Sequence, residues 1–231
     1  MSRIQIAIVA LSFALLSNDA IAKKTVFIIS RHVAPSQAQA YSIDGNQITL
    51  QADVNISTYN QGFGAVGNAV WPEKELMFVT YENSDMLVWA STKTLEKVGE
   101  FDTDISDLAG IVIDTEKELI YVVQRRYDEL YIYSFDDVNN TLILENTYEL
   151  QPSESYIDPW WGLALDEEND LLYVTDTSNQ VHYYDTNDWS LKGYVDITVE
   201  SNNRRAVGIA VDPNRGYIFL RVGACPPSCP A

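Results

Sequence analysis

Histidine and cysteine are scarce in this sequence, and each shortage excludes a class of site. The 231 residues include 2 histidines, His32 and His182, and 2 cysteines, Cys225 and Cys229. A histidine-based catalytic triad and a histidine-rich zinc site are therefore disfavoured. The cysteines lie together at the C-terminus and would close a small disulfide loop in an exported chain, so disulfides do not hold the rest of the chain together. G-x-S-x-G, H-E-x-x-H and P-loop motifs are also missing.

Positive charge is the next shortage. The chain has 15 Lys and Arg against 33 Asp and Glu, a formal net charge of −18. Nucleic acids and anionic membrane surfaces would repel such a chain at long range, so we expect neither as a partner. A protein, peptide or glycan ligand remains compatible with this charge.

Long apolar runs are missing except at the N-terminus. Arg3 precedes the apolar segment Ile4 to Leu16, and Ala20-Ile-Ala22 has the small-x-small pattern of a cleavage site. This predicts a secretory signal peptide over residues 1–22 and a secreted or periplasmic protein with no membrane insertion after cleavage. The alternative is an uncleaved N-terminal anchor, but the run is shorter than the ~20 apolar residues of a membrane span.

What the sequence does contain is a repeat. Four times a glycine opens a short apolar run, a turn follows, and a second β-rich run ends the unit. The glycines are 43, 52 and 46 residues apart, which is the period of a four-stranded propeller blade. We therefore predict an all-β fold, a β-propeller of four-stranded antiparallel blades occupying residues 23–231, with blades starting at Gly67, Gly110, Gly162 and Gly208.

The third copy illustrates the four strands expected in each blade. They are Gly162 to Leu165, Leu171 to Thr175, Gln180 to Asp185 and Leu191 to Ile197. The turn after the first strand starts with an aspartate that can accept backbone N–H bonds, namely Asp114, Asp166 or Asp212. The glycines have a structural role in this prediction, because neighbouring blades converge at the propeller axis.

The two ends of the chain are out of phase with the repeat. Thr25 to Ser30, Gln37 to Ile43 and Gln47 to Ile56 resemble second, third and fourth strands without a first one. Gly208 to Val211 and Tyr217 to Arg221 resemble a first and a second strand. About four to five blades are thus present, and they form either a propeller with an incomplete C-terminal end or a small four-blade ring with an irregular seam.

The pattern Gly-hydrophobic-Ala-hydrophobic-Asp, followed by Tyr-Val-Thr in the copy from Gly162, resembles the YVTN and NHL-type repeats of the YncE-like and six-blade propeller superfamily. The resemblance covers most of the chain after residue 22. It implies an extracytoplasmic propeller whose ligand lies over the central channel. Some six-blade lactonase-like propellers use a metal site of carboxylates and asparagine, whose ligands cannot be transferred residue by residue to this chain.

Candidate ligand-binding residues fall in loops expected around one channel mouth. Adjacent tryptophans can stack on a sugar or peptide side chain, and paired arginines can bind a carboxylate or phosphate. The alternatives are tryptophans that fill the space between blades and arginines paired with neighbouring acids. The candidates are Trp160, Trp161, Arg204, Arg205, Arg125, Arg126 and Tyr127.

A Ca²⁺ site is a further candidate. Asp102-Thr-Asp-Ile-Ser-Asp107 places three carboxylates together but lacks the glycine and glutamate of an EF-hand loop, so a solvated turn is the alternative. The candidate ligands at the channel mouth are Asp104, Asp107, Asp158 and Asn203.

Three functions follow from these features. The first is a non-enzymatic binding or scaffold module, and the second is a metal-dependent hydrolase, lactonase-like or lyase-like enzyme. In the third, the chain is an incomplete propeller that self-associates through an exposed strand edge.

Overall fold

The computed structural model describes residues 24–29, 37–44, 46–55, 65–81, 84–124, 129–150, 162–175, 180–197 and 205–223. These residues form five antiparallel β-sheets and two short 3₁₀ turns, Glu167–Asn169 and Pro213–Arg215. The predicted all-β propeller architecture is confirmed. Within the described part of the chain, no helix has the length and apolarity to cross a membrane.

Three sheets are complete four-stranded blades, each with its strands in chain order. Blade 2 consists of β4 (Ala65–Trp71), β5 (Leu76–Tyr81), β6 (Met86–Ser91) and β7 (Lys97–Asp102). Blade 3 consists of β8 (Leu108–Asp114), β9 (Leu119–Gln124), β10 (Glu129–Asp136) and β11 (Thr141–Glu149). Blade 4 consists of β12 (Leu163–Asp166), β13 (Leu171–Thr175), β14 (Gln180–Asp185) and β15 (Leu191–Asp196).

The two end sheets have fewer described strands. Blade 1 has three, β1 (Lys24–Ile29), β2 (Gln37–Asp44) and β3 (Gln47–Asn55). Blade 5 has two, β16 (Arg205–Asp212) and β17 (Tyr217–Gly223). These strands overlap the segments expected from the sequence, and among the described residues blade 1 has no strand corresponding to a first strand.

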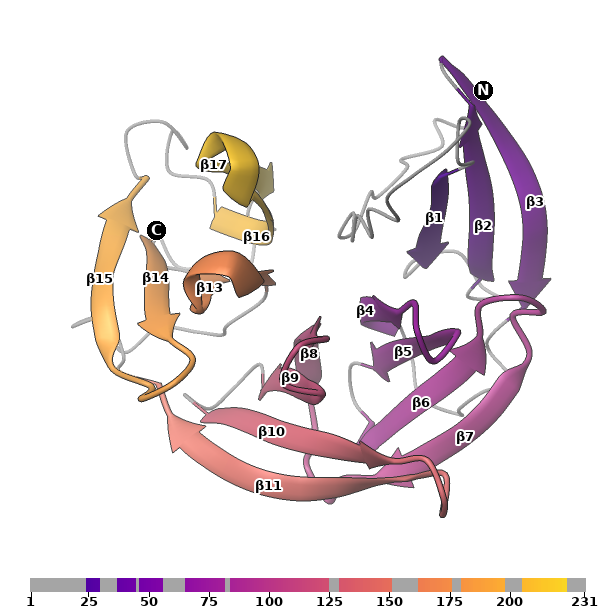
Figure 1. Ribbon diagram of the computed structural model, residues 1–231, viewed down its shortest axis with the longest axis horizontal. Helices are drawn as coiled ribbons and strands as arrows, with labels where there is room; N and C mark the ends of the chain where they lie inside the picture. The colour runs from indigo at the N-terminus through magenta and orange to yellow at the C-terminus, as the bar shows by residue number, and fades with distance from the viewer. Residues whose placement is uncertain are drawn as a thin grey trace.

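The five sheets form an open arc (Figure 1). Their innermost strands contact one another in chain order, β1 with β4, β4 with β8, β8 with β12, and β12 with β16. Blade 1 and blade 5 lie at the two ends of the arc (Figure 1). The described residues thus form an open part of a propeller and not the closed four-blade ring considered above.

Alternating side chains on the second strand of each blade explain this stacking. In β5, Met77 and Val79 pack toward blade 1, while Phe78 packs in the cluster shared with blade 3. In β9, Tyr121 packs in the cluster shared with blade 4, and in β13 Tyr173 packs toward blade 5. A strand with apolar residues on both faces is thus buried between two neighbouring blades, since successive side chains point to opposite faces.

Two repeat glycines allow the close approach of the inner strands. A Cβ on Gly67 would lie 2.5 Å from the backbone oxygen of Ala109 in blade 3. A Cβ on Gly162 would lie 3.2 Å from the Cα of Gly208 in blade 5. The structural role expected for these glycines is therefore supported by the packing at the axis.

The repeat aspartates have the predicted role in the turns. The carboxylate of Asp114 accepts a hydrogen bond from the backbone N–H of Lys117 at 2.8 Å. Asp166 accepts one from Asn169 at 3.1 Å, and Asp212 accepts one from Arg215 at 3.2 Å. The first copy has Trp71 at this position, and its turn is held by a backbone bond from Glu75 to Pro72 instead.

Candidate functional site

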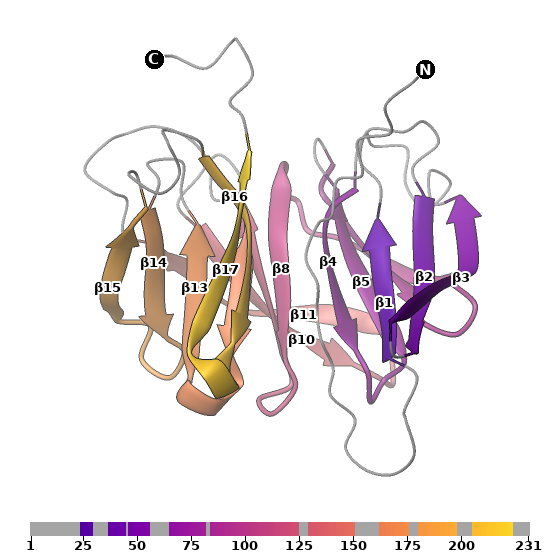
Figure 2. The same cartoon turned by 90° about the horizontal axis from the view of Figure 1, so that it is seen from above.

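The strands run between two rims of the arc (Figure 2). The turn rim carries the short turns that join the first strand to the second and the third to the fourth. The loop rim carries the connections from the second strand to the third and from one blade to the next. The sequence candidates were all expected at the loop rim.

Most of the candidate residues lie outside the described residues. These are Trp160, Trp161, Arg204, Arg125, Arg126, Tyr127, Asp158 and Asn203. Arg205 is the first residue of β16 and pairs through its backbone register with Gly223, which places it at the loop-rim end of blade 5. The ligand-binding role of all these residues stays a prediction.

The best-described part of the loop rim is the β7–β8 loop, residues 103–107. Thr103 fixes the start of this loop, because its backbone N–H and its hydroxyl both donate to the carbonyl of Asp85, at 2.8 and 2.6 Å. The N–H of Ile105 donates back to the Thr103 hydroxyl at 3.2 Å. Asp104 and Asp107 both have positive φ, 57° and 60°. The loop is thus a tight, internally bonded structure with an exposed carboxylate at Asp104.

A polar cluster with two buried members, Gln124 and Tyr131, contacts this loop. The side-chain amide of Gln124, at the end of β9, donates to the backbone oxygen of Ser106 at 2.9 Å. The hydroxyl of Tyr131 lies 3.2 Å from the Gln124 carbonyl oxygen and also bonds Glu129. Burial, followed by the hydrogen bond to Glu129, raises the pKa of Tyr131, so its hydroxyl stays protonated as a donor. The cluster ties the β7–β8 loop to both ends of the β9–β10 connection.

Sequence analysis did not single out Ser106, Gln124, Glu129 or Tyr131. Gln124 and Glu129 flank the connection that holds Arg125, Arg126 and Tyr127, and Ser106 lies within the Asp102–Asp107 segment, so both candidate segments were the available signal. Their hydrogen bonding depends on blade geometry and has no local sequence pattern.

The structure describes two of the four candidate metal ligands, Asp104 and Asp107. Asp104 is exposed and Asp107 is buried, and among the described residues no group of three or more His, Cys, Asp or Glu could hold a metal ion. Asp158 and Asn203 lie outside the described residues. The four-residue Ca²⁺ site therefore stays a prediction.

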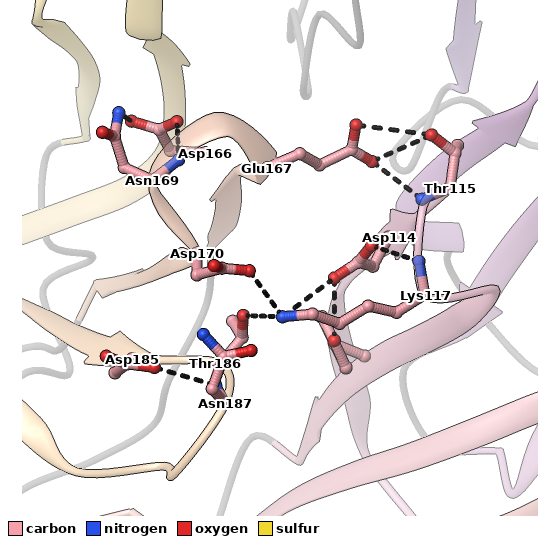
Figure 3. A network of polar contacts seen from close by, with 11 residues as sticks. Asp114, Thr115, Lys117, Asp166, Glu167, Asn169, Asp170, Asp185, Thr186 and Asn187 are labelled. Carbon is pink, nitrogen blue, oxygen red and sulfur yellow. Dashed lines mark hydrogen bonds and ion pairs between the residues drawn. The ribbon is translucent and has the colours of Figure 1, made fainter.

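The turn rim holds a different kind of polar network, which links blades 3 and 4 (Figure 3). The Lys117 ammonium donates to Asp170 at 2.7 Å and to the hydroxyl of Thr186 at 2.6 Å. It also lies 3.8 Å from the buried carboxylate of Asp114, which accepts a 3.0 Å bond from the Tyr121 hydroxyl. One lysine thus joins a carboxylate of its own blade to two groups of the next blade.

A second contact runs parallel to the first. The carboxylate of Glu167 in blade 4 accepts a 2.8 Å bond from the backbone N–H of Thr115 in blade 3. The Thr115 hydroxyl lies 3.2 and 3.3 Å from the two Glu167 oxygens. Figure 3 shows both contacts crossing between the two blades.

These contacts shift two pKa values in the direction expected for a structural role. The hydrogen bond from Lys117, with a smaller contribution from Asn187, lowers the pKa of Asp170. Burial, followed by the charge of Asp114, raises the pKa of Tyr121. At neutral pH Asp170 is therefore a charged acceptor and Tyr121 a neutral donor, as their hydrogen bonds in this network require.

Comparisons with solved structures agree on the fold. The chain resembles a protein chain in the "Crystal structure of Nidogen/Laminin Complex", with a TM-score of 0.63 and 13% sequence identity. The match covers 87% of this chain and 69% of the other chain. It resembles Sqt1 of Saccharomyces cerevisiae with a TM-score of 0.58 at 8% identity, covering 86% of this chain and 53% of that one. Identities this low show the fold alone.

No curated protein sequence matches the chain. A sequence profile of a family does match, over residues 36–192, which is more than half of the chain. The matched segment runs from β2 of blade 1 to the start of β15 in blade 4 and includes the β7–β8 loop and the contacts between blades 3 and 4. The chain belongs to the family described as "Lactonase, 7-bladed beta-propeller".

Proposed function

We propose that this propeller is exported and binds a protein, peptide or glycan partner through its loop rim. The observation that carries the proposal is the contrast between the rims. On the turn rim, the described aspartates cap turns and Lys117 bridges two blades. On the loop rim, an internally bonded loop presents Asp104 to solvent and contacts Gln124, the residue before Arg125 and Arg126.

The polar cluster beneath the β7–β8 loop supports this role. Gln124 and Tyr131 fix the loop from below, so ligand binding would cost little ordering of this part of the rim. Adjacent tryptophans in the blade 3 to blade 4 connection would supply the stacking surface. Arg125 and Arg126 follow Gln124 directly and would meet an acidic group on the partner.

Titration calorimetry with a panel of neutral oligosaccharides and of acidic and neutral peptides tests the proposal. For any member that binds, we expect Trp160→Ala or Trp161→Ala to weaken binding about tenfold, as for a central aromatic contact. Trp189→Phe is the control, because Trp189 lies in the β14–β15 turn of the turn rim, where it stacks on Tyr148 of blade 3. Equal losses from the control and the loop-rim variants would contradict a loop-rim site.

The second candidate is hydrolysis of a lactone ring, which the family match favours. In this reaction water adds to the ester carbonyl, the ring C–O bond breaks, and the product is a hydroxy acid that releases a proton. A pH-indicator assay with a sugar lactone follows that proton, with and without Ca²⁺ and a chelator. Acceleration above the buffer rate that disappears in Asp107→Asn would replace the binding proposal with the enzyme.

A further inference from the structure

The turn between β10 and β11 contains a motif for N-linked glycosylation. The sequence has two Asn-x-Ser/Thr motifs whose middle residue is not proline, Asn55-Ile-Ser57 and Asn139-Asn-Thr141. Such a motif is a glycan acceptor where it lies on the surface of an exported protein. The side chain of Asn55 lies outside the described residues, whereas the second motif is described throughout. The structure therefore tests the surface requirement at Asn139.

The second motif lies on an exposed turn. Residues 137–140 join β10 to β11, and all four of their side chains are exposed. Val138, next to Asn139, is 92% exposed. Thr141, which supplies the hydroxyl of the motif, is the first residue of β11 and is partly exposed. This turn belongs to the turn rim, so a glycan on Asn139 leaves the loop rim free.

The two asparagines of the motif have different environments. Asn140 contacts blade 2, because its Oδ1 accepts a 3.0 Å bond from Nε1 of Trp89 and its Nδ2 donates to the backbone oxygen of Val98 at 3.3 Å. Asn139 bonds within its own turn. Its backbone N–H and its side-chain amide donate to the two carboxylate oxygens of Asp136, at 3.1 and 2.6 Å. The acceptor amide is therefore separate from the contacts between blades.

The residues on both sides of Asn139 hold the turn in place. The carboxylate of Asp137 accepts a 2.6 Å bond from the ammonium group of Lys74 in blade 2. Asn140 reaches the same blade through Trp89. A glycan on Asn139 displaces neither contact, because both are made by other side chains. The exposed position of the acceptor is thus built into the packing of blade 3 on blade 2.

Exposed apolar side chains lie on this hairpin and beside it. Val138 in the turn is 92% exposed, and Ile143 and Leu144 on β11 are 47% and 49% exposed. Val98, whose backbone oxygen contacts Asn140, is 46% exposed. Exposed apolar surface of this kind promotes unwanted association. A bulky, polar glycan on Asn139 would shield the nearest of these residues, Val138, and this shielding gives the modification a physical benefit.

We propose that Asn139 carries an N-linked glycan in the exported protein, an inference that rests on the export proposed above. Nδ2 of Asn139 forms a bond to the anomeric carbon of a sugar carried on a polyprenyl diphosphate. The bond from that carbon to the diphosphate breaks, the diphosphate leaves with the bonding electrons, and Nδ2 loses one proton. Nδ2 keeps one hydrogen, so its hydrogen bond to Asp136 is retained.

Mass spectrometry of the full chain expressed in a secreting eukaryotic cell line tests the proposal. We expect the secreted chain to begin near Lys23 and the peptide that contains Asn139 to carry a glycan. Peptide N-glycosidase should remove this glycan and convert Asn139 to aspartate. A secreted chain with an unmodified Asn139 would overturn the glycan and leave the export standing, whereas a chain retained in the cytoplasm would overturn both.

A matched pair of substitutions at Thr141 separates the motif from the fold. Thr141→Ser keeps the hydroxyl and should keep the glycan. Thr141→Val keeps the branched shape of a strand residue but removes the hydroxyl, so it should lose the glycan. Equal glycan occupancy at Asn139 in the two variants would overturn the assignment of this motif.

The shielding of Val138 is tested in an Asn55→Gln background, which removes the other motif. The chain that keeps Asn139 should bind less of an apolar fluorescent dye than the same chain with Asn139→Gln. Its melting temperature should be almost the same, because the contacts of Asp137 and Asn140 do not involve the acceptor amide. Equal dye binding would contradict the shielding, and a lower melting temperature of the glycosylated chain would contradict the retained turn.

Discussion

The turn rim and the loop rim are built from the same repeat but use their polar residues differently. On the turn rim, Asp114, Asp166 and Asp212 each bond a backbone N–H of their own turn, and Lys117 reaches the next blade. On the loop rim, the described polar groups hold one loop in place, and Asp104 remains exposed. The comparison teaches that the aspartate repeated in three of the blades serves stability, and we expect function in residues that differ between blades.

The largest expected effect lies in the buried carboxylate of the turn rim. Asp114→Ala removes the partner of the Lys117 N–H, of the Tyr121 hydroxyl and of the Lys117 ammonium. We expect it to lower the free energy of unfolding by about 3 kcal/mol, because buried donors lose a charged acceptor. Urea denaturation measures this change.

Asp104→Ala is the loop-rim counterpart of that variant. Asp104 is exposed, so loss of its carboxylate costs little, and the φ of 57°, which alanine tolerates less well than aspartate, limits the expected change in the free energy of unfolding to about 1 kcal/mol. Similar costs for the two aspartates would break the distinction between the rims.

A smaller effect is expected from the lysine between blades 3 and 4. Lys117→Met keeps an apolar stem but removes the ammonium that bonds Asp170 and Thr186. We expect a smaller loss of stability than for Asp114→Ala, since solvent screens the partly exposed pair with Asp170 and Asp114 keeps its bonds to the Lys117 N–H and the Tyr121 hydroxyl. Lys93→Met is the control, because the Lys93–Glu75 pair joins two exposed side chains within one blade. If thermal unfolding shows that Lys93→Met costs as much stability as Lys117→Met, the contact between blades does not explain the loss.

The smallest effect is a pH dependence. Because folding lowers the pKa of Asp170, its ionised carboxylate stabilises the native state above the ordinary aspartate pKa of about 3.9. That contribution is lost as the pH falls through the lowered native pKa. The stability difference between the wild type and Asp170→Asn should therefore shrink in acid, and a difference that grows below pH 4 (about the ordinary aspartate pKa) would have the wrong sign.

Much of the fold follows from local sequence. The strands of blade 4 begin and end within one residue of their expected positions, because alternating apolar residues and an aspartate turn mark them directly. In blade 2 the fourth strand begins only at Lys97, because Leu95, although apolar, has a φ of 57° and belongs to the preceding turn. Hydrophobicity alone does not report this backbone change.

The contacts between blades could not be predicted in the same way. Lys117 and Asp170 are separated by a whole blade in sequence, and their hydrogen bond depends on how blades 3 and 4 stack. The same is true of Ser106, Gln124 and Tyr131 under the β7–β8 loop. The sequence predicts where the loops lie. It does not predict the side chains that hold the β7–β8 loop in place, because those contacts depend on the blade geometry.

We propose that ligands bind at the loop rim, whereas the turn rim holds the blades together. Hydrogen–deuterium exchange with and without the oligosaccharide or peptide that binds in calorimetry tests it most directly. We predict new protection in the β7–β8 loop and in the loop-rim connections 125–128 and 151–161, with no change in the turns 115–118 and 167–170. Protection confined to those turns would contradict the account.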